Sequence, residues 1–301
     1  MIWSLYNKYR GVVFGLLSGL FWALNLFLID KVTYTYKSLS DNYLFFSAIV
    51  LLFIEFFSFL LLFFLKGKNI FLDISSNIRV IKSNICLLFF SAMGMGLYIL
   101  SIIFSGAVIT AYFTSIYPIF SLLFIFILYR KISYRVFVSI ILSSIGLFLT
   151  TEYTDIDAFE IYGIIFALLC ACSWGSESVC CEYLSIKYIK SETILFFRYI
   201  FSIFLSILFV LTFLFLGYTI SLNQEFLFYL FLVSFFSLSS YLLYYNAISL
   251  IGASYAINLN VGYILWIMLF SFSTYHFTHF SIIGGIFIFI SIIFSFFRGS
   301  K

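Results

Sequence analysis

The residues able to do chemistry in this sequence are conspicuous because so few polar side chains interrupt its apolar runs. Glu177 lies within GIIFALLCACSWGSESV (163–179), three residues after Trp174, so the carboxylate and the indole share one face of a helix. Trp22 and Asn25 repeat this spacing near the N-terminus, with a neutral amide in place of the acid. A charged side chain at the centre of a bilayer costs about 2.5–3.5 kcal/mol on insertion scales, so buried acids are rare and usually functional.

Further aromatic and amide side chains recur at helical spacing in the C-terminal half. The three tyrosines of YLLYYN (241–246) fall on one helical face, and INLNVGYILW (257–266) places an amide, a tyrosine and a tryptophan three residues apart. In a chain with 24% aromatic residues, a single tyrosine more often belongs to the core than to a site, whereas tryptophan is scarce. With Trp22, Trp174 and Glu177, the candidate site residues are Tyr241, Tyr245, Asn258, Asn260, Tyr263 and Trp266, together with Tyr112 from an earlier segment.

Several aromatic faces beside one carboxylate favour a cage for an organic cation. A desolvated contact between a cation and an aromatic face is worth about 2 kcal/mol, and quaternary ammonium groups are frequent ligands of such cages. The carboxylate adds an attraction that a low dielectric strengthens. Glu177 is also a candidate proton carrier. A substrate and a proton that compete for one acid would have their movements coupled.

The other polar candidates favour structural roles. Glu55, in LLFIEFF, has no tryptophan partner and is interpreted as a packing or intersubunit acid. His276 and His279 form an H-x-x-H pair without a further ligand nearby, which favours an interfacial pair over a metal site. The five cysteines lack metal-ligand spacing and are interpreted as packing residues. No metal and no cofactor is predicted.

The elements that must position these residues are transmembrane helices. The chain is 64% hydrophobic and 9% charged, whereas soluble domains carry about 25% charged residues. A spanning helix needs about 20 mostly apolar residues. The sequence therefore predicts an all-α integral membrane protein whose ten spans lie at 11–29, 42–65, 84–104, 107–128, 134–151, 162–184, 192–216, 226–248, 253–273 and 280–297.

The connections and their charges predict the orientation. With the N-terminus inside, all of the 16 lysines and arginines except Lys31 and Lys37 fall on the cytoplasmic side, Arg198 among them. The external segment 151–160 is acidic, and the longest connection runs from Lys66 to Ser83. Both termini are predicted to be cytoplasmic, in a multi-pass protein of the cytoplasmic (inner) membrane. The basic balance reflects membrane orientation, and no nucleic-acid partner is predicted.

An internal repeat divides the chain into two halves, 1–151 and 152–301. GVVFGLLSGLFWALN (11–25) aligns with GIIFALLCACSWGSE (163–177), and Trp22 falls on Trp174. GAVITAYFTSIYPIF (106–120) aligns with GASYAINLNVGYILW (252–266), whose first glycines mark tight joints between spans. Five spans per half is an odd number, so the halves would insert with opposite orientations. Inverted repeats are typical of secondary transporters, which bind substrate near the midplane. The alternative is an old duplication that now serves only packing.

Ten spans in a five-plus-five inverted repeat resemble the EamA-type branch of the drug/metabolite transporter superfamily. Four stretches further resemble the LicB-type bacterial choline transporters, and WGSES with its Trp and Glu is the most specific. These stretches are FGLLSGLFWALN (14–25), AYFTSIYPIFSLL (111–123), ALLCACSWGSESV (167–179) and YLLYYNAISLIGASYAINLNVGYILWIMLF (241–270). The chain departs from the wider superfamily at LYRKIS (128–133), where an L-G-E-like turn is usual.

The resemblance implies an importer of choline with an aromatic box. Trp22, Trp174 and Tyr245 would form the walls, Glu177 would lie beside the ammonium group, and Asn258 or Asn260 would lie near the hydroxyl group. The expected protein is thus a non-enzymatic choline transporter, a symporter if protons are coupled, acting as a monomer or homodimer. The alternatives are an exporter of amino acids or cationic drugs and, from another class, an intramembrane enzyme acting on lipid head groups.

Overall fold

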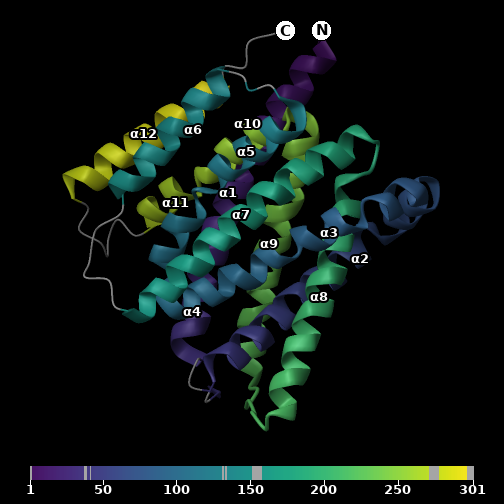
Figure 1. Ribbon diagram of the computed structural model, residues 1–301, viewed down its shortest axis with the longest axis vertical. Helices are drawn as coiled ribbons and strands as arrows, with labels where there is room; N and C mark the ends of the chain where they lie inside the picture. Colours follow the sequence, from purple (N-terminus) through teal and green to yellow (C-terminus); the bar gives the residue numbers. More distant parts are fainter. Residues whose placement is uncertain are drawn as a thin grey trace.

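The computed structural model describes residues 2–36, 39–40, 42–130, 132, 134–150, 158–270 and 278–296, and the elements within these ranges are all helices (Figure 1). In chain order these are α1 (Ile2–Tyr36), α2 (Tyr43–Ser83), α3 (Ile85–Ser91), α4 (Met93–Thr114), α5 (Tyr117–Tyr129), α6 (Tyr134–Thr150), α7 (Ala158–Ile186), α8 (Ser191–Phe215), α9 (Gln224–Ile251), α10 (Ala253–Val261), α11 (Tyr263–Phe270) and α12 (His279–Phe296).

Eight segments of these helices are long and apolar enough to cross a membrane. They are Tyr9–Tyr36, Tyr43–Ser83, Ile85–Gly106, Ile109–Tyr129, Glu160–Ile186, Ser191–Phe215, Gln224–Ile251 and Ala253–Phe270. The remaining apolar helices, α6 and α12, are shorter. Each segment coincides with one of the predicted runs, which confirms the prediction of an all-helical multi-pass membrane protein for the residues that the structure describes.

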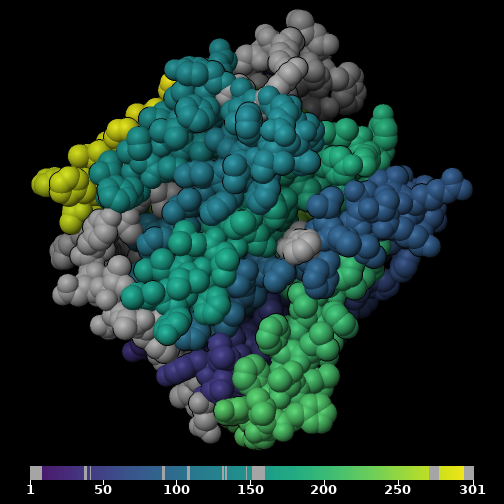
Figure 2. All heavy atoms as spheres, viewed as in Figure 1, coloured from purple at the N-terminus to yellow at the C-terminus, as the bar shows by residue number. Residues whose placement is uncertain are grey.

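Helix α2 differs from the prediction, because the expected connection from Lys66 to Ser83 is helical. The helix has 41 residues, about 60 Å at 1.5 Å per residue, or twice the thickness of the hydrocarbon core. Its C-terminal part protrudes from the bundle (Figures 1 and 2). Asp73 Oδ2 accepts a hydrogen bond of 3.0 Å from the backbone N–H of Lys190, and Lys66 Nζ lies 3.6 Å from Glu192. No proline interrupts this stretch, so the helix continues with only a kink at Asn77.

Two glycines make the predicted tight joints. Gly106 interrupts α4 at φ 77° and ψ 170°, and Gly252 separates α9 from α10 at φ 86° and ψ 157°. Only glycine adopts this backbone region without strain. The break between α4 and α5 falls at Ser115 and Ile116, directly before the turn of helix that contains Pro118.

The helices pack in pairs that join the two halves of the chain. Helix α1 lies along α9, α4 along α7, α2 along α8 and α6 along α12. The shorter helices also cross between halves, with α5 against α7 and with α10 and α11 against α1 (Figure 1). At the crossing of α6 and α12 the backbones touch, because a Cβ atom on Gly146 would lie 2.6 Å from the carbonyl oxygen of Gly284. The interior faces of α1, α4, α7 and α9 enclose the aromatic cluster described below.

Candidate functional site

A cavity of about 30 Å³ lies inside the bundle. A cavity needs about 10–15 Å³ by this measure to hold one water molecule. Its walls come from both halves of the chain, through α1, α5, α7, α9, α10 and α11. The lining residues are Trp22, Tyr117, Trp174, Glu177, Ser240, Tyr241, Tyr244, Asn260 and Tyr263.

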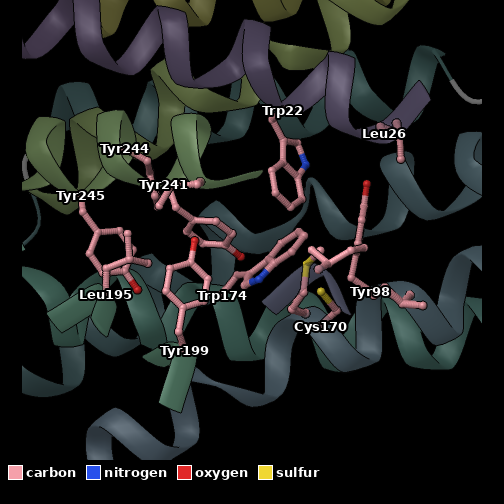
Figure 3. Close-up of a cluster of buried hydrophobic side chains, with 14 of the residues drawn as sticks. Trp22, Leu26, Tyr98, Cys170, Trp174, Leu195, Tyr199, Tyr241, Tyr244 and Tyr245 are labelled. Atoms are coloured by element: carbon pink, nitrogen blue, oxygen red, sulfur yellow. The ribbon is translucent and has the colours of Figure 1, made fainter. Parts of the chain in front are cut away.

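Two tryptophans form the centre of this wall (Figure 3). The rings of Trp22 and Trp174 meet edge to face, with centroids 5.2 Å apart and an interplanar angle of 85°. Tyr98 packs behind both, at 5.2 Å from Trp22 and 5.1 Å from Trp174. Tyr241 meets the other side of Trp22 at 5.6 Å and 82°. Gly94 fits under the Trp174 indole, since a Cβ atom there would lie 2.6 Å from Cδ1. The two indoles are therefore held by packing from α4 and α9.

A chain of hydrogen bonds holds the tyrosine and amide side of the cavity. The Tyr117 hydroxyl donates to Asn260 Oδ1 at 2.8 Å, and Asn260 Nδ2 donates to Ser18 Oγ at 2.8 Å. The Tyr263 hydroxyl donates to the carbonyl oxygen of Ala111 at 2.7 Å. These bonds connect α5, α10, α1, α11 and α4, so the polar side of the cavity ties the two halves together.

Glu177 places a carboxylate at the cavity wall, and its two oxygens have different surroundings. Its Oε1 accepts a hydrogen bond from the Tyr245 hydroxyl and lies 3.1 Å from Arg198 Nε. Its Oε2 is buried and has no hydrogen-bond partner among the described residues. A buried, unsatisfied charged oxygen costs more than a neutral one, which favours a cationic ligand or a proton at this position.

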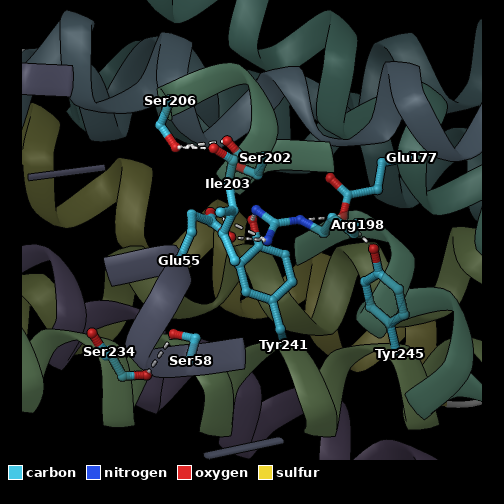
Figure 4. Close-up of polar contacts among 10 residues, drawn as sticks. All are labelled: Glu55, Ser58, Glu177, Arg198, Ser202, Ile203, Ser206, Ser234, Tyr241 and Tyr245. Carbon is cyan, nitrogen blue, oxygen red and sulfur yellow. Dashed lines mark hydrogen bonds and ion pairs between the residues drawn. The ribbon is translucent and has the colours of Figure 1, made fainter. Parts of the chain in front are cut away.

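Arg198 lies between two buried carboxylates (Figure 4). Its Nη1 lies 3.1 Å from Glu55 Oε2, and its Nη2 donates to the Tyr241 hydroxyl at 3.0 Å. The guanidinium carbon lies 4.1 Å above the Tyr241 ring, a cation–π contact. The side chains of Arg198 and Glu55 are 0% and 1% exposed. Breaking such a buried pair on one side is strongly destabilising, because it leaves an uncompensated charge.

Two interpretations from the sequence are therefore wrong. Arg198 does not belong to the cytoplasmic charges, because α8 begins at Ser191 and turns this side chain into the bundle. Glu55 is not an intersubunit acid, since it is fully buried beside Arg198, and of the two expected roles only the packing role remains. A signal for Arg198 was present in the sequence: the buried serines of α8 continue the same helical face at 202 and 206, at spacings of four residues.

The structure brings together most, but not all, of the site residues predicted from the sequence. Trp22, Trp174, Glu177, Tyr241, Asn260 and Tyr263 line the cavity, and Tyr245 bonds to Glu177 behind it. Tyr117 and Tyr244, which lie in the aromatic segments considered from the sequence but were not chosen as site residues, also line the cavity, and so does Ser240, which was not considered. Asn258, Trp266 and Tyr112 are not among the lining residues.

Two of these residues lie in other surroundings. Helix α10 ends at Val261 and α11 begins at Tyr263, with Gly262 between them at helical backbone angles (φ −53°, ψ −9°). The Trp266 ring instead packs on Phe270, with centroids 6.3 Å apart. Asn258 is fully buried, and neither atom of its amide group has a partner within the described chain. Asn25, which matches Glu177 in the repeat, donates to the carbonyl oxygen of Val233 at 3.0 Å.

The remaining polar candidates do not form a second site. Within the described ranges, no three His, Cys, Asp or Glu residues are grouped closely enough to hold a metal ion. His279 begins α12, and His276 lies outside the described residues. The cysteines are all free thiols; Cys86 is exposed rather than packed.

Binding is what this arrangement can do chemically. Glu177 lies at the cavity wall with Arg198 and Glu55 behind it, and with all three groups ionised their charges sum to −1. The aromatic faces beside it attract a cation without needing hydrogen bonds from it. The charges and the aromatic faces are therefore of the kind that attract a singly charged organic cation.

Comparisons with known proteins agree with a transporter fold. A comparison with curated proteins gives no match. One solved structure, named only "Crystal structure of protein", has a TM-score of 0.60 and 11% identity over 95% of this chain and 96% of its own. At this identity the likeness concerns the fold alone. Residues 161–297, which include Trp174, Glu177 and Arg198, match the model of the EamA-like transporter family, and this part of the chain carries an EamA-like transporter domain.

Proposed function

We propose that this protein is a secondary transporter that imports choline across the cytoplasmic membrane. The observation that carries the proposal is the buried carboxylate of Glu177, whose Oε2 has no partner within the described residues, at a cavity walled by Trp22, Trp174 and tyrosines. A quaternary ammonium group fits such walls because it has no N–H groups to satisfy. The match of residues 161–297 to a transporter family supports movement of a small solute over catalysis.

The proposal includes two inverted five-helix repeats, 1–151 and 152–301. In support, α1 pairs with α9 as α7 pairs with α4, and the joints at Gly106 and Gly252 share one unusual backbone conformation. The close contacts also correspond. A Cβ atom on Gly11 would meet Ile251, next to one joint, and a Cβ atom on Gly163 would meet Ser105, next to the other.

Choline entry then requires the aromatic walls to separate. A cavity of about 30 Å³ is too small for a trimethylammonium group. Trp22 belongs to the first repeat and Trp174 to the second, and their rings are in contact at 5.2 Å. Rocking one repeat against the other, as in other transporters of inverted repeats, would separate these rings and admit the cation.

Proton coupling is a part of the proposal that can be tested by itself. Glu177 would take up a proton on one side of the membrane and release it on the other in the same cycle that moves choline, so an inward proton gradient would drive choline uptake in proteoliposomes. We expect uptake to rise when the outside is acidified relative to the lumen and to lose this dependence in Glu177→Gln. Uptake that ignores the gradient in the wild type would limit the proposal to uncoupled transport.

Binding to purified protein tests the substrate. We expect choline to stabilise the wild type against thermal unfolding and Trp174→Ala to weaken binding roughly 30-fold, the loss of about 2 kcal/mol from one wall of the cage. Trp266→Phe serves as the matched tryptophan variant, because that ring packs on Phe270 away from the cavity. Its affinity should stay within about threefold of the wild type, a difference below about 0.7 kcal/mol.

The outcome separates choline import from the runner-up. An absence of choline binding, or an unchanged response in Trp174→Ala, contradicts the proposal. Binding of arginine or cationic drugs in preference to choline would favour an exporter of amino acids or drugs. The sedimentation coefficient of the detergent-solubilised protein distinguishes a monomer from a homodimer.

A further inference from the structure

We infer that Glu55 and Arg198, which do not line the cavity, set the charge of the cage and thereby its selectivity for a singly charged cation. The inference rests on the proposed function, since it concerns the same cage. Glu55 lies on α2, Arg198 on α8 and Glu177 on α7, so three helices contribute one ionised group each.

Arg198 is a buried cation that contacts two residues of the cage, Glu177 and Tyr241. Its Nε lies 3.1 Å from Glu177 Oε1, whereas Oε2 of that carboxylate has no hydrogen-bond partner among the described residues. Its guanidinium covers the Tyr241 ring at 4.1 Å, while the same ring meets Trp22 at 5.6 Å. Arg198 alone would therefore neutralise Glu177 and leave the cage with no net charge.

Glu55 removes that neutralisation. Both of its oxygens accept hydrogen bonds from Arg198 Nη1, at 3.3 Å and 3.1 Å, so one guanidinium is divided between two carboxylates. The charges of Glu55, Arg198 and Glu177 sum to −1. Asp73, the other buried acid in the described chain, lies outside this group and accepts a hydrogen bond from the backbone N–H of Lys190. A bound monocation brings the sum to zero. A neutral ligand leaves a buried net charge, and a dication leaves one of opposite sign, so both are disfavoured.

The test compares choline with its neutral isostere, in which a tert-butyl group replaces the trimethylammonium group. The measured quantity is the ratio of the two affinities. Glu55→Gln keeps the side-chain shape and brings the sum to zero, so the ratio should fall at least roughly tenfold through loss of choline affinity. Glu55→Gln combined with Arg198→Gln restores the sum to −1, so the ratio should return to within about threefold of the wild type.

Two further variants separate charge from shape. Glu55→Asp keeps the charge and shortens the side chain, and it should retain the wild-type ratio. Ser206→Ala, two turns along α8 from Arg198 and neutral, is the matched control for a buried change in the same helix. If Glu55→Gln does not fold, Glu55→Asp and the double variant still test the inference. A ratio of the two affinities that is tenfold lower than in the wild type, in either variant, contradicts it.

The result also distinguishes this inference from the proposed function. If Glu55→Gln weakens both ligands equally, so that the ratio is unchanged, Glu55 only supports the structure and the inference is wrong while choline binding stands. A wild type that ignores choline contradicts the proposed function. In that case a panel of monovalent organic ammonium ions is screened for one that stabilises the wild type, and the ratio test uses that ion. If no ion of the panel stabilises the wild type, both the inference and the proposed function are contradicted.

Discussion

At the scale of residues, the site is defined by how the buried carboxylate at the cavity wall is held. Glu177 Oε1 is bonded by Tyr245 and paired with Arg198, whereas Oε2 has no partner among the described residues. Hydrogen bonds to charged groups contribute about 1.5–3 kcal/mol, roughly twice a neutral bond. The Tyr245 hydroxyl therefore holds Oε1 in place, although its own ring is not part of the cavity lining.

Removing that hydroxyl gives a prediction at this scale. Tyr245→Phe should weaken choline binding by roughly tenfold, about 1.4 kcal/mol, because the carboxylate loses one of the two contacts that orient it. Tyr98→Phe is the control: the Tyr98 hydroxyl has no partner in the described chain, and its ring contacts with both tryptophans remain. Isothermal titration with choline measures both. Equal affinities in the two variants would show that the hydroxyl does not orient Glu177.

At the scale of elements, glycines decide where helices bend and where they touch. Gly106 and Gly252 adopt a positive φ with an extended ψ, a region that is essentially restricted to glycine. Gly146 and Gly284 instead allow the backbones of α6 and α12 to touch. The two kinds of glycine therefore respond differently to an added methyl group.

The joint at Gly106 gives a stability prediction. Nothing lies within 4 Å of a Cβ atom built there, so Gly106→Ala should lower the free energy of unfolding by about 1–3 kcal/mol through backbone strain alone. Gly67→Ala is the control, because Gly67 is helical and its Cβ would make an ordinary 3.5 Å contact with Phe63. That substitution should be neutral or stabilising by up to about 1 kcal/mol. Thermal unfolding in detergent compares them; equal shifts would contradict the assigned strain.

At the scale of the whole molecule, pairing between halves places the cavity where the two halves meet. Trp22 and Tyr117 come from the N-terminal half, and Trp174, Glu177 and Tyr263 from the C-terminal half. Opening and closing at this interface would expose the cation to one side of the membrane and then the other. The direction of the helices across the membrane therefore decides which end of the cavity faces the cytoplasm.

Cysteine labelling in cells tests that orientation. Tyr34, near the end of α1, and Tyr188, between α7 and α8, are 82% and 87% exposed. With both termini cytoplasmic, Tyr34→Cys should react with a membrane-impermeant maleimide in intact cells, and Tyr188→Cys only after permeabilisation. Cys86 is exposed and would itself react, so both variants are made in a Cys86→Ser background, and that background alone is the unlabelled control. The reverse pattern would show that the termini and the basic loops lie outside the cell, opposite to the predicted orientation.

The sequence by itself determined the class of protein, the positions of the eight helices long enough to span a membrane, the glycine joints and the cavity pair of Trp174 with Glu177. These features follow from local composition and helical spacing, because a segment's own residues set its apolar length and the face of the helix on which each side chain lies. Only the tertiary structure decided the rest. Arg198 and Glu55 are 143 residues apart, and counting charges along the chain assigned one to the cytoplasm and the other to packing. Their pairing depends on how α2 and α8 lie together, because a buried charge is tolerated only where another helix supplies its counterion.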